Sequence, residues 1–106
     1  MEKTNVSISL WKESVVHLRI TNAAKEFIKH ATADDSSLKL RFYGVASSNG
    51  LLIGADIDTL IDSDFKMDVD GYTVGISPEV LPKLQTATIH AEKQASREGI
   101  ILLNCK

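Results

Sequence analysis

Apolar and polar residues alternate in two segments close to the start of the sequence, residues 5–10 and residues 16–20. A period of two is typical of a β-strand with one buried face. The polar residues Lys12–Ser14 separate the two segments, so together they predict an N-terminal β-hairpin. We therefore expect residues 1–18 to be a strand-forming extension ahead of the rest of the domain.

The strongest helix pattern follows directly after these segments. Thr21 is a favourable N-cap, and the helix is expected to open at Asn22. Apolar residues then recur with the spacing of one helical face: Ala24, Phe27, Ile28 and Ala31. Turn-forming residues over 33–37 are expected to end the helix.

Two alternating segments in the middle of the chain predict further strands. Residues 38–42 form the first, and residues 51–57 form the second, with Asp56 and Asp58 on the polar face. Small and turn-prone residues fill 44–50 between them, and we expect this stretch to be a loop.

Asp70-Gly71 lies between two alternating apolar runs and predicts a β-hairpin. Asp-Gly is preferred in two-residue type I′ turns, because both central residues of that turn have positive φ. The expected register places three cross-strand pairs on one apolar face: Val69 with Tyr72, Met67 with Val74, and Phe65 with Ile76.

The last third of the chain predicts a short helix and two strands. Ser77 is an N-cap followed by proline and glutamate, and the helix should end near Leu84. A strand is expected over 86–92, a polar connection over 93–98, and a final strand over 100–104.

These elements amount to one long helix, one short helix and about seven strands, more strand than the roughly 20–25% of an average protein. The sequence has 106 residues, of which 43% are hydrophobic and 25% are charged, as in ordinary globular domains. We therefore expect a β-rich α+β fold made of one domain over residues 1–106.

Charge and hydropathy exclude two classes of partner. The net charge is −2 at pH 7, so the broad basic surface that nucleic-acid binding needs is not expected. No apolar run approaches the ~20 residues of a membrane span, and the first residues lack a signal-peptide pattern. The sequence thus predicts a cytoplasmic protein that binds neither nucleic acid nor membrane.

Six aspartates lie within residues 56–70 and raise the question of a calcium site. The EF-hand pattern, with its glutamate at position twelve, is missing from this stretch. Asp56 and Asp58 belong to the outer face of a strand. The others lie where turns are expected: Asp62, Asp64, Asp68 and Asp70. We interpret all six as solvated side chains rather than calcium ligands.

The three histidines do not form a catalytic or metal-binding motif. His90 and Glu92 share a strand face, but two ligands are too few for a structural metal site. His30 is explained by the dipole at the end of its helix, and His17 belongs to a predicted strand. No nucleophile-elbow or phosphate-loop motif is present. We therefore expect no enzymatic activity, unless Ser48, His90 and Glu92 converge in one pocket.

Cys105 is the only cysteine of the sequence, so no intramolecular disulfide is possible. A thiolate is the softest metal ligand that the chain has. One thiol per chain cannot build a closed metal site, but several copies in a symmetric oligomer can contribute one each. The alternative is that this cysteine has no function.

The ordered motifs resemble the HesB-like, A-type iron–sulfur cluster carrier family. Ile20–Ala24 resembles the start of that family's first helix, and Leu38–Phe42 its next strand. Gly44–Gly50 corresponds to the ligand loop, and the apolar strand that follows has Gly54 and Asp58 at comparable places. The Asp-Gly hairpin, the short helix and the last strand continue the parallel, which covers about residues 19 to 104.

The resemblance implies a mixed-sheet sandwich or pseudobarrel with a helix packed alongside. Carriers of the family hold iron or a cluster with one loop cysteine and a C-terminal C-x-C pair. In this sequence the loop position falls among Ser47, Ser48 and Asn49, and the pair is reduced to Cys105. Serine is a much poorer ligand for iron–sulfur sites than cysteine.

Two hypotheses about function stay open at this point. The first is a cytosolic HesB-like protein without a conventional three-cysteine site. It would bind a protein partner in iron–sulfur assembly, or bind iron or a cluster weakly through Cys105 of more than one subunit in a homo-oligomer. The second is a metal-free protein-interaction or dimerisation domain. The alternation over Val6–Trp11 favours it, because such a segment can add a strand to a sheet or to a neighbouring molecule.

Overall fold

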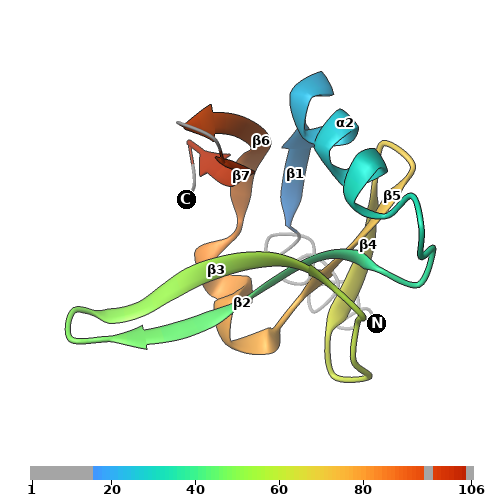
Figure 1. Ribbon diagram of the computed structural model, residues 1–106. Helices are drawn as coiled ribbons and strands as arrows, with labels where there is room; N and C mark the ends of the chain where they lie inside the picture. Colours follow the sequence, from blue (N-terminus) through green and yellow to red (C-terminus); the bar gives the residue numbers. More distant parts are fainter. Residues whose placement is uncertain (1–15, 95–96, 105–106) are drawn as a thin grey trace, which may run out of the picture.

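The computed structural model describes residues 16–94 and 97–104 (Figure 1), and it contains two β-sheets, one α-helix and one short 3₁₀ helix. The elements follow in the order β1 (His17–Ile20), α2 (Asn22–Ala31), β2 (Lys39–Ser47), β3 (Gly50–Asp58), β4 (Phe65–Val69), β5 (Tyr72–Ile76), η1 (Pro78–Lys83), β6 (Thr86–Gln94) and β7 (Arg97–Leu103). The predicted β-rich α+β class is confirmed.

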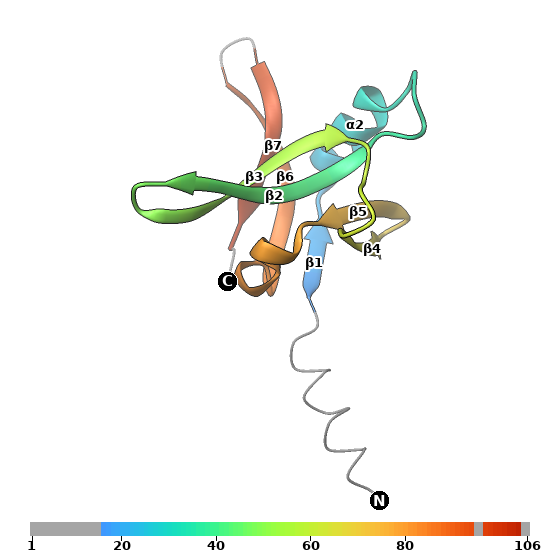
Figure 2. The same ribbon diagram turned by 90° about the horizontal axis from the view of Figure 1, so that it is seen from below.

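Both sheets are mixed. The smaller has the order β1-β6-β7, with β1 parallel and β7 antiparallel to β6. The larger has the order β3-β2-β5-β4, in which β2 and β5 are parallel and the outer pairs are antiparallel hairpins. Over the described residues the two sheets do not join into a closed barrel. The hairpin of β2 and β3 projects from the body of the molecule (Figures 1 and 2).

The main helix forms where the sequence predicts it. The Thr21 Oγ1 accepts a hydrogen bond from the Ala24 N–H at 3.2 Å and so caps the first turn. Ala24 and Ile28 are buried, which places the predicted apolar face against the core. The helix ends at Ala31, just before the expected turn residues.

The hairpin of β4 and β5 has the predicted turn and register. Asp70 has a φ of 51° and Gly71 a φ of 90°, as a type I′ turn requires. The three predicted pairs on the apolar face are confirmed, and Phe65 at one end of that face is 44% exposed. β4 is an outer strand of its sheet. Phe65 lies at the end of β4 away from the Asp70-Gly71 turn, and Lys25 of α2 contacts that turn through an ion pair with Asp70.

Two predicted loops are wrong because strand pairing extends into them. Residues 44–47 continue β2, where Gly44 pairs with Ile53, so the expected loop shrinks to a two-residue turn. The polar stretch 93–98 is mostly strand as well, since Lys93 pairs with Glu98 across β6 and β7. Backbone hydrogen bonds to a neighbouring strand outweigh the turn preference of small or polar side chains.

The predicted N-terminal hairpin involves residues 5–10, which lie outside the described residues. The second segment of that prediction does form a strand, β1, and its described partner is β6. The final strand ends at Leu103 rather than Asn104, which has a positive φ of 52°.

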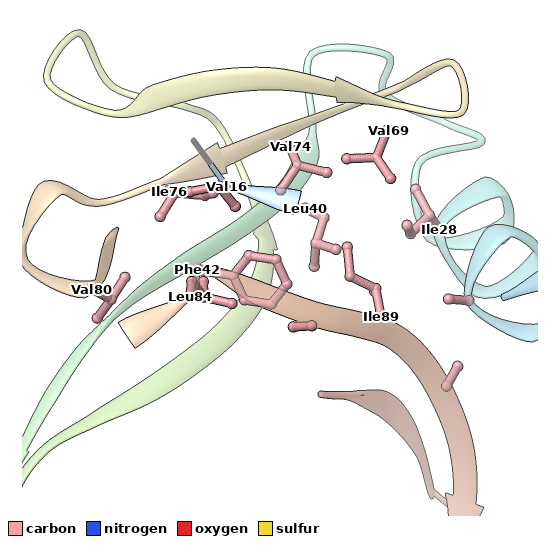
Figure 3. Close-up of a cluster of buried hydrophobic side chains, with 13 residues drawn as sticks. Val16, Ile28, Leu40, Phe42, Val69, Val74, Ile76, Val80, Leu84 and Ile89 are labelled. Carbon is pink, nitrogen blue, oxygen red and sulfur yellow. The ribbon is translucent and has the colours of Figure 1, made fainter. Parts of the chain in front are cut away.

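The core lies between the two sheets and against α2 (Figure 3). Its largest fully buried side chains come from both sheets, from η1 and from the residue that follows it: Phe42, Leu40, Ile76, Leu84, Ile89, Val74 and Val80. Two pairs of outer strands approach each other at the open sides of the sandwich, β1 with β4 and β3 with β7. Both approaches leave a groove, and the second groove is apolar.

Candidate functional site

The β2–β3 turn contains the residues that correspond to the ligand loop in the family resemblance. Ser47 pairs with Gly50, which leaves Ser48 and Asn49 as the turn itself. The Ser47 hydroxyl donates to the Gly50 carbonyl at 2.7 Å and accepts from the Asn49 N–H at 3.2 Å. This hydroxyl is therefore used to close the turn.

The exposed tip of this hairpin has only oxygen and amide donors to offer a metal. The side chains at the tip are Ser48 and Asn49, both exposed to solvent. Iron–sulfur clusters are held by cysteine thiolates, and hydroxyl and amide groups are poor replacements. The described residues thus do not fit a cluster held by three cysteines of one chain.

Ser48, His90 and Glu92 do not converge. The β2–β3 turn lies at the opposite end of the molecule from α2 in both views (Figures 1 and 2). His90 lies beside the start of α2, where its Nδ1 is 2.8 Å from the Thr21 Oγ1. Glu92 is exposed further along β6.

The remaining histidines also lie apart from other metal ligands. His30 is in the last turn of α2, as expected, with its Nε2 3.6 Å from the carboxylate of Glu26. His17 is exposed on β1. Within residues 16–94 and 97–104, no three His, Cys, Asp or Glu side chains are grouped closely enough to hold a metal ion. Cys105 lies outside the described residues.

The interpretation of the aspartates as solvated holds for Asp56 and Asp58 but is wrong for Asp64. The Asp64 side chain is buried, with none of its surface exposed. Its two oxygens accept hydrogen bonds from Arg41 at 2.7 and 3.0 Å, and one also accepts from the Ile61 N–H at 3.1 Å. The Arg41 hydrogen bonds hold the pKa of Asp64 below its ordinary value, against the opposing effect of burial.

A second carboxylate links η1 to β2. Glu79 accepts hydrogen bonds from the Ser77 hydroxyl and, at 3.2 Å, from the Gly44 N–H. The Ser77 hydroxyl is the main cause that lowers the pKa of Glu79. A side chain at Gly44 would put its Cβ 2.8 Å from the Glu79 Cγ and 2.9 Å from the Leu51 Cδ1, so any larger residue requires these two side chains to shift. Arg41, Asp64 and Glu79 thus support the fold around β2.

An apolar groove with a volume of about 710 Å³ lies between β3 and β7. Its lining is aliphatic apart from Lys83: Leu51, Leu52, Ile53, Ala55, Ile100, Ile101 and Leu102. Leu52 is 53% exposed, the largest fraction among the exposed large hydrophobic side chains of the described residues. Exposed apolar surface of this kind is typical of an interaction site.

No family model matches the chain, and no curated protein matches its sequence. Solved structures do match. SufA of Escherichia coli, which is involved in biosynthesis of iron–sulfur clusters, superposes with a TM-score of 0.68 at 15% identity. The match covers 83% of this chain and 80% of SufA. The chain has the fold of the A-type carriers.

Two further structures agree with this assignment. IscA, solved with a [2Fe–2S] cluster, matches with a TM-score of 0.63 at 14% identity, over 82% of this chain and 84% of IscA. A protein from Aquifex aeolicus matches with a TM-score of 0.55 at 21% identity, over 85% of this chain and 93% of its own. The family resemblance inferred from the sequence is therefore confirmed at the level of the fold.

Within the described part of the chain, no helix is both long and apolar enough to cross a bilayer.

Proposed function

We propose that this chain is an iron–sulfur biogenesis protein that acts by binding a partner protein and carries no conventional three-cysteine cluster. Its fold is that of SufA and IscA, and this shared fold supports a role in iron–sulfur biogenesis. The observation that distinguishes the chain from a cluster carrier is the composition of the β2–β3 turn, which has no cysteine. This turn is formed by Ser47–Gly50, and the Ser47 hydroxyl is held by two hydrogen bonds within the turn.

The number of thiols limits what the chain can hold. A [2Fe–2S] cluster takes four protein ligands, usually all cysteines. The sequence has one cysteine, Cys105. A fully thiolate-ligated cluster would thus need four copies at one site, while one iron ion shared between two copies would have two thiolates. The second case gives weak binding at most.

The surface favours binding over catalysis. Three described carboxylates have lowered pKa values, and each serves the structure: Asp35 bonds to Ser37, Asp64 pairs with Arg41, and Glu79 bonds to Ser77. By contrast, the groove between β3 and β7 exposes aliphatic side chains to solvent. Such a groove with little charge suits protein recognition. We therefore propose that the chain is not an enzyme.

Anaerobic reconstitution with iron and sulfide tests this proposal. Wild-type protein, Cys105→Ser and IscA as a positive control are reconstituted, desalted and assayed for iron, acid-labile sulfide and visible absorption. We expect the cluster absorption of IscA to be absent from both forms of this chain.

The iron content then separates the two forms of the proposal. Substoichiometric iron in the wild type that is lost in Cys105→Ser would assign weak, shared iron binding to that cysteine. No iron in either protein would leave partner binding alone. A stable, stoichiometric cluster that survives Cys105→Ser would contradict the proposal.

A further inference from the structure

We propose that the groove between β3 and β7 binds residues 5–11 of a second copy of this chain as an added β-strand. We name residues 5–11 the N-terminal segment. The inference concerns self-association and does not depend on iron, so it goes beyond the proposed function and can fail separately from it.

The two strands that border the groove have the composition of strands covered on both faces. Leu51–Ala55 of β3 and Gly99–Leu103 of β7 contain only apolar residues and glycine. Uninterrupted apolar strands are typical of positions buried from both sides. Nevertheless Leu52 is 53% exposed and Leu103 is 38% exposed. The composition of these strands thus indicates that both of their faces are buried, but the described residues leave Leu52 and Leu103 exposed.

Both strands are also at sheet edges. β3 is paired only with β2, and β7 only with β6, among the described strands. Proteins usually protect such edges with charged residues, proline or a bulge. Asp56 and Asp58 do this at one end of β3, but Leu51–Ala55 contains no charge and no proline. The unprotected part of the edge coincides with the groove.

The N-terminal segment has the pattern that this site requires. Val6, Ile8 and Leu10 alternate with serines, so an extended segment has one aliphatic and one polar face. Val6–Leu10 spans five residues, as many as each of the two apolar stretches that border the groove. The aliphatic face can fill the groove while the serines face solvent, and the backbone can pair with an open edge.

The position of Val16 favours the segment of a second copy over the chain's own. The described chain begins at Val16, immediately before β1. β1 and β7 are the opposite edges of the three-stranded sheet, with β6 between them. The described chain therefore begins at the edge of that sheet opposite to β7, the strand that borders the groove. A second copy can approach directly and receive the first copy's segment in return, which gives a closed two-fold dimer.

Sedimentation of the full-length chain tests the proposal with two pairs of variants. Ile8→Lys puts a charge on the apolar face of the segment, and its control, Ser7→Lys, puts the same charge on the polar face. Leu52→Lys charges the groove, and its control, Ile61→Lys, charges an exposed aliphatic residue that does not line the groove. Circular dichroism verifies that each variant is folded.

We expect the wild type and both controls to sediment as dimers. Ile8→Lys and Leu52→Lys should each weaken dimerisation about tenfold or more, because each buries an unpaired charge. Mixing these two variants should restore a dimer with one intact contact. Ile8→Lys supplies an unchanged groove, and Leu52→Lys supplies an unchanged N-terminal segment.

Three results would overturn the inference. The first is a monomeric wild type, which includes the case of a segment bound within its own chain. The second is a dimer that Ile8→Lys does not weaken, as expected if two grooves pack face to face. The third is a loss of dimers in both variants that mixing does not reverse. None of these results bears on cluster content, so the proposed function would stand or fall independently.

Discussion

At the scale of single residues, the clearest departure from the sequence pattern is Asp64. It belongs to a run of aspartates that looks uniformly solvated, yet its side chain is buried. Arg41 and the Ile61 N–H satisfy both of its oxygens. The ring of Tyr43 lies 5.8 Å from the Arg41 guanidinium and adds to this cluster. The ion pair ties the loop before β4 to the first part of β2.

The partner of Asp64 could not be found from local sequence because it lies 23 positions away. The structure shows why Arg41 needs a partner, since it lies between the buried Leu40 and Phe42 in a strand that pairs on both sides. A charge in that position requires a counter-ion. In the sequence alone, Arg41 is one polar residue of an alternating strand, and nothing distinguishes Asp64 from the other five aspartates.

We expect Asp64→Asn to lower the free energy of unfolding by about 3 kcal/mol, because it leaves Arg41 without its counter-ion. Urea unfolding at pH 7 measures this value. Asp62→Asn, at an exposed neighbour, is the control and should change stability by less than about 0.5 kcal/mol. Equal effects of the two substitutions would contradict the assignment.

The same pair predicts a pH dependence. The pKa of Asp64 is lowered in the folded protein, so its ionised form stabilises the fold above the unfolded value of about 3.9. That stabilisation is lost as the pH falls through the lowered folded pKa. The stability difference between wild type and Asp64→Asn should therefore narrow below about pH 4. A difference that stays constant in acid would exclude this role of the carboxylate.

At the scale of elements, the sequence predicted best those features that depend on neighbouring residues. The cap of α2 at Thr21 and the Asp70-Gly71 turn are both set within a few residues, and both are confirmed. The lengths of β2 and β6 were underestimated, because pairing with β3 and β7 draws small and polar residues into strands. Strand ends depend on a partner strand, which local propensity does not contain.

Gly71 provides a test of the turn geometry. Its φ of 90° disfavours any residue with a Cβ, although a Cβ there would contact nothing within 4 Å. We expect Gly71→Ala to destabilise the protein by about 1–2 kcal/mol through backbone strain alone.

Gly99→Ala is the matched control for this substitution. A Cβ at Gly99 also has open space, but its backbone is in the ordinary region for L-residues. We expect a change of less than about 0.5 kcal/mol in thermal or urea unfolding. If Gly71→Ala is equally neutral, the turn is not type I′ in solution.

At the scale of the whole molecule, the order of motifs along the chain was more informative than any single motif. No family model matches, and identity to SufA and IscA is only 15% and 14%, yet the fold is shared. Hydrophobic alternation, the capped helix and the Asp-Gly turn are constraints on folding, and all three can be recognised in this sequence alone. The groove between β3 and β7 could not be predicted, because it depends on how two sheet edges meet.

The candidate site departs from the family resemblance, whereas the fold agrees with it. The turn at Ser47–Gly50 is well formed, and its hydroxyl closes the hairpin where the family resemblance expects a thiolate. The prediction for Cys105 stays a prediction, since that residue lies outside the described part of the chain. Fold and ligand set are therefore separable: the packing of the sandwich does not require cysteines at the tip of its hairpin.

The iron and acid-labile sulfide content of protein purified without oxygen tests the central claim most directly, namely that this carrier fold works without a conventional cluster. The account predicts colourless protein with less than one iron per chain and no acid-labile sulfide. Coloured protein with a stoichiometric [2Fe–2S] cluster that persists in Cys105→Ser would contradict it.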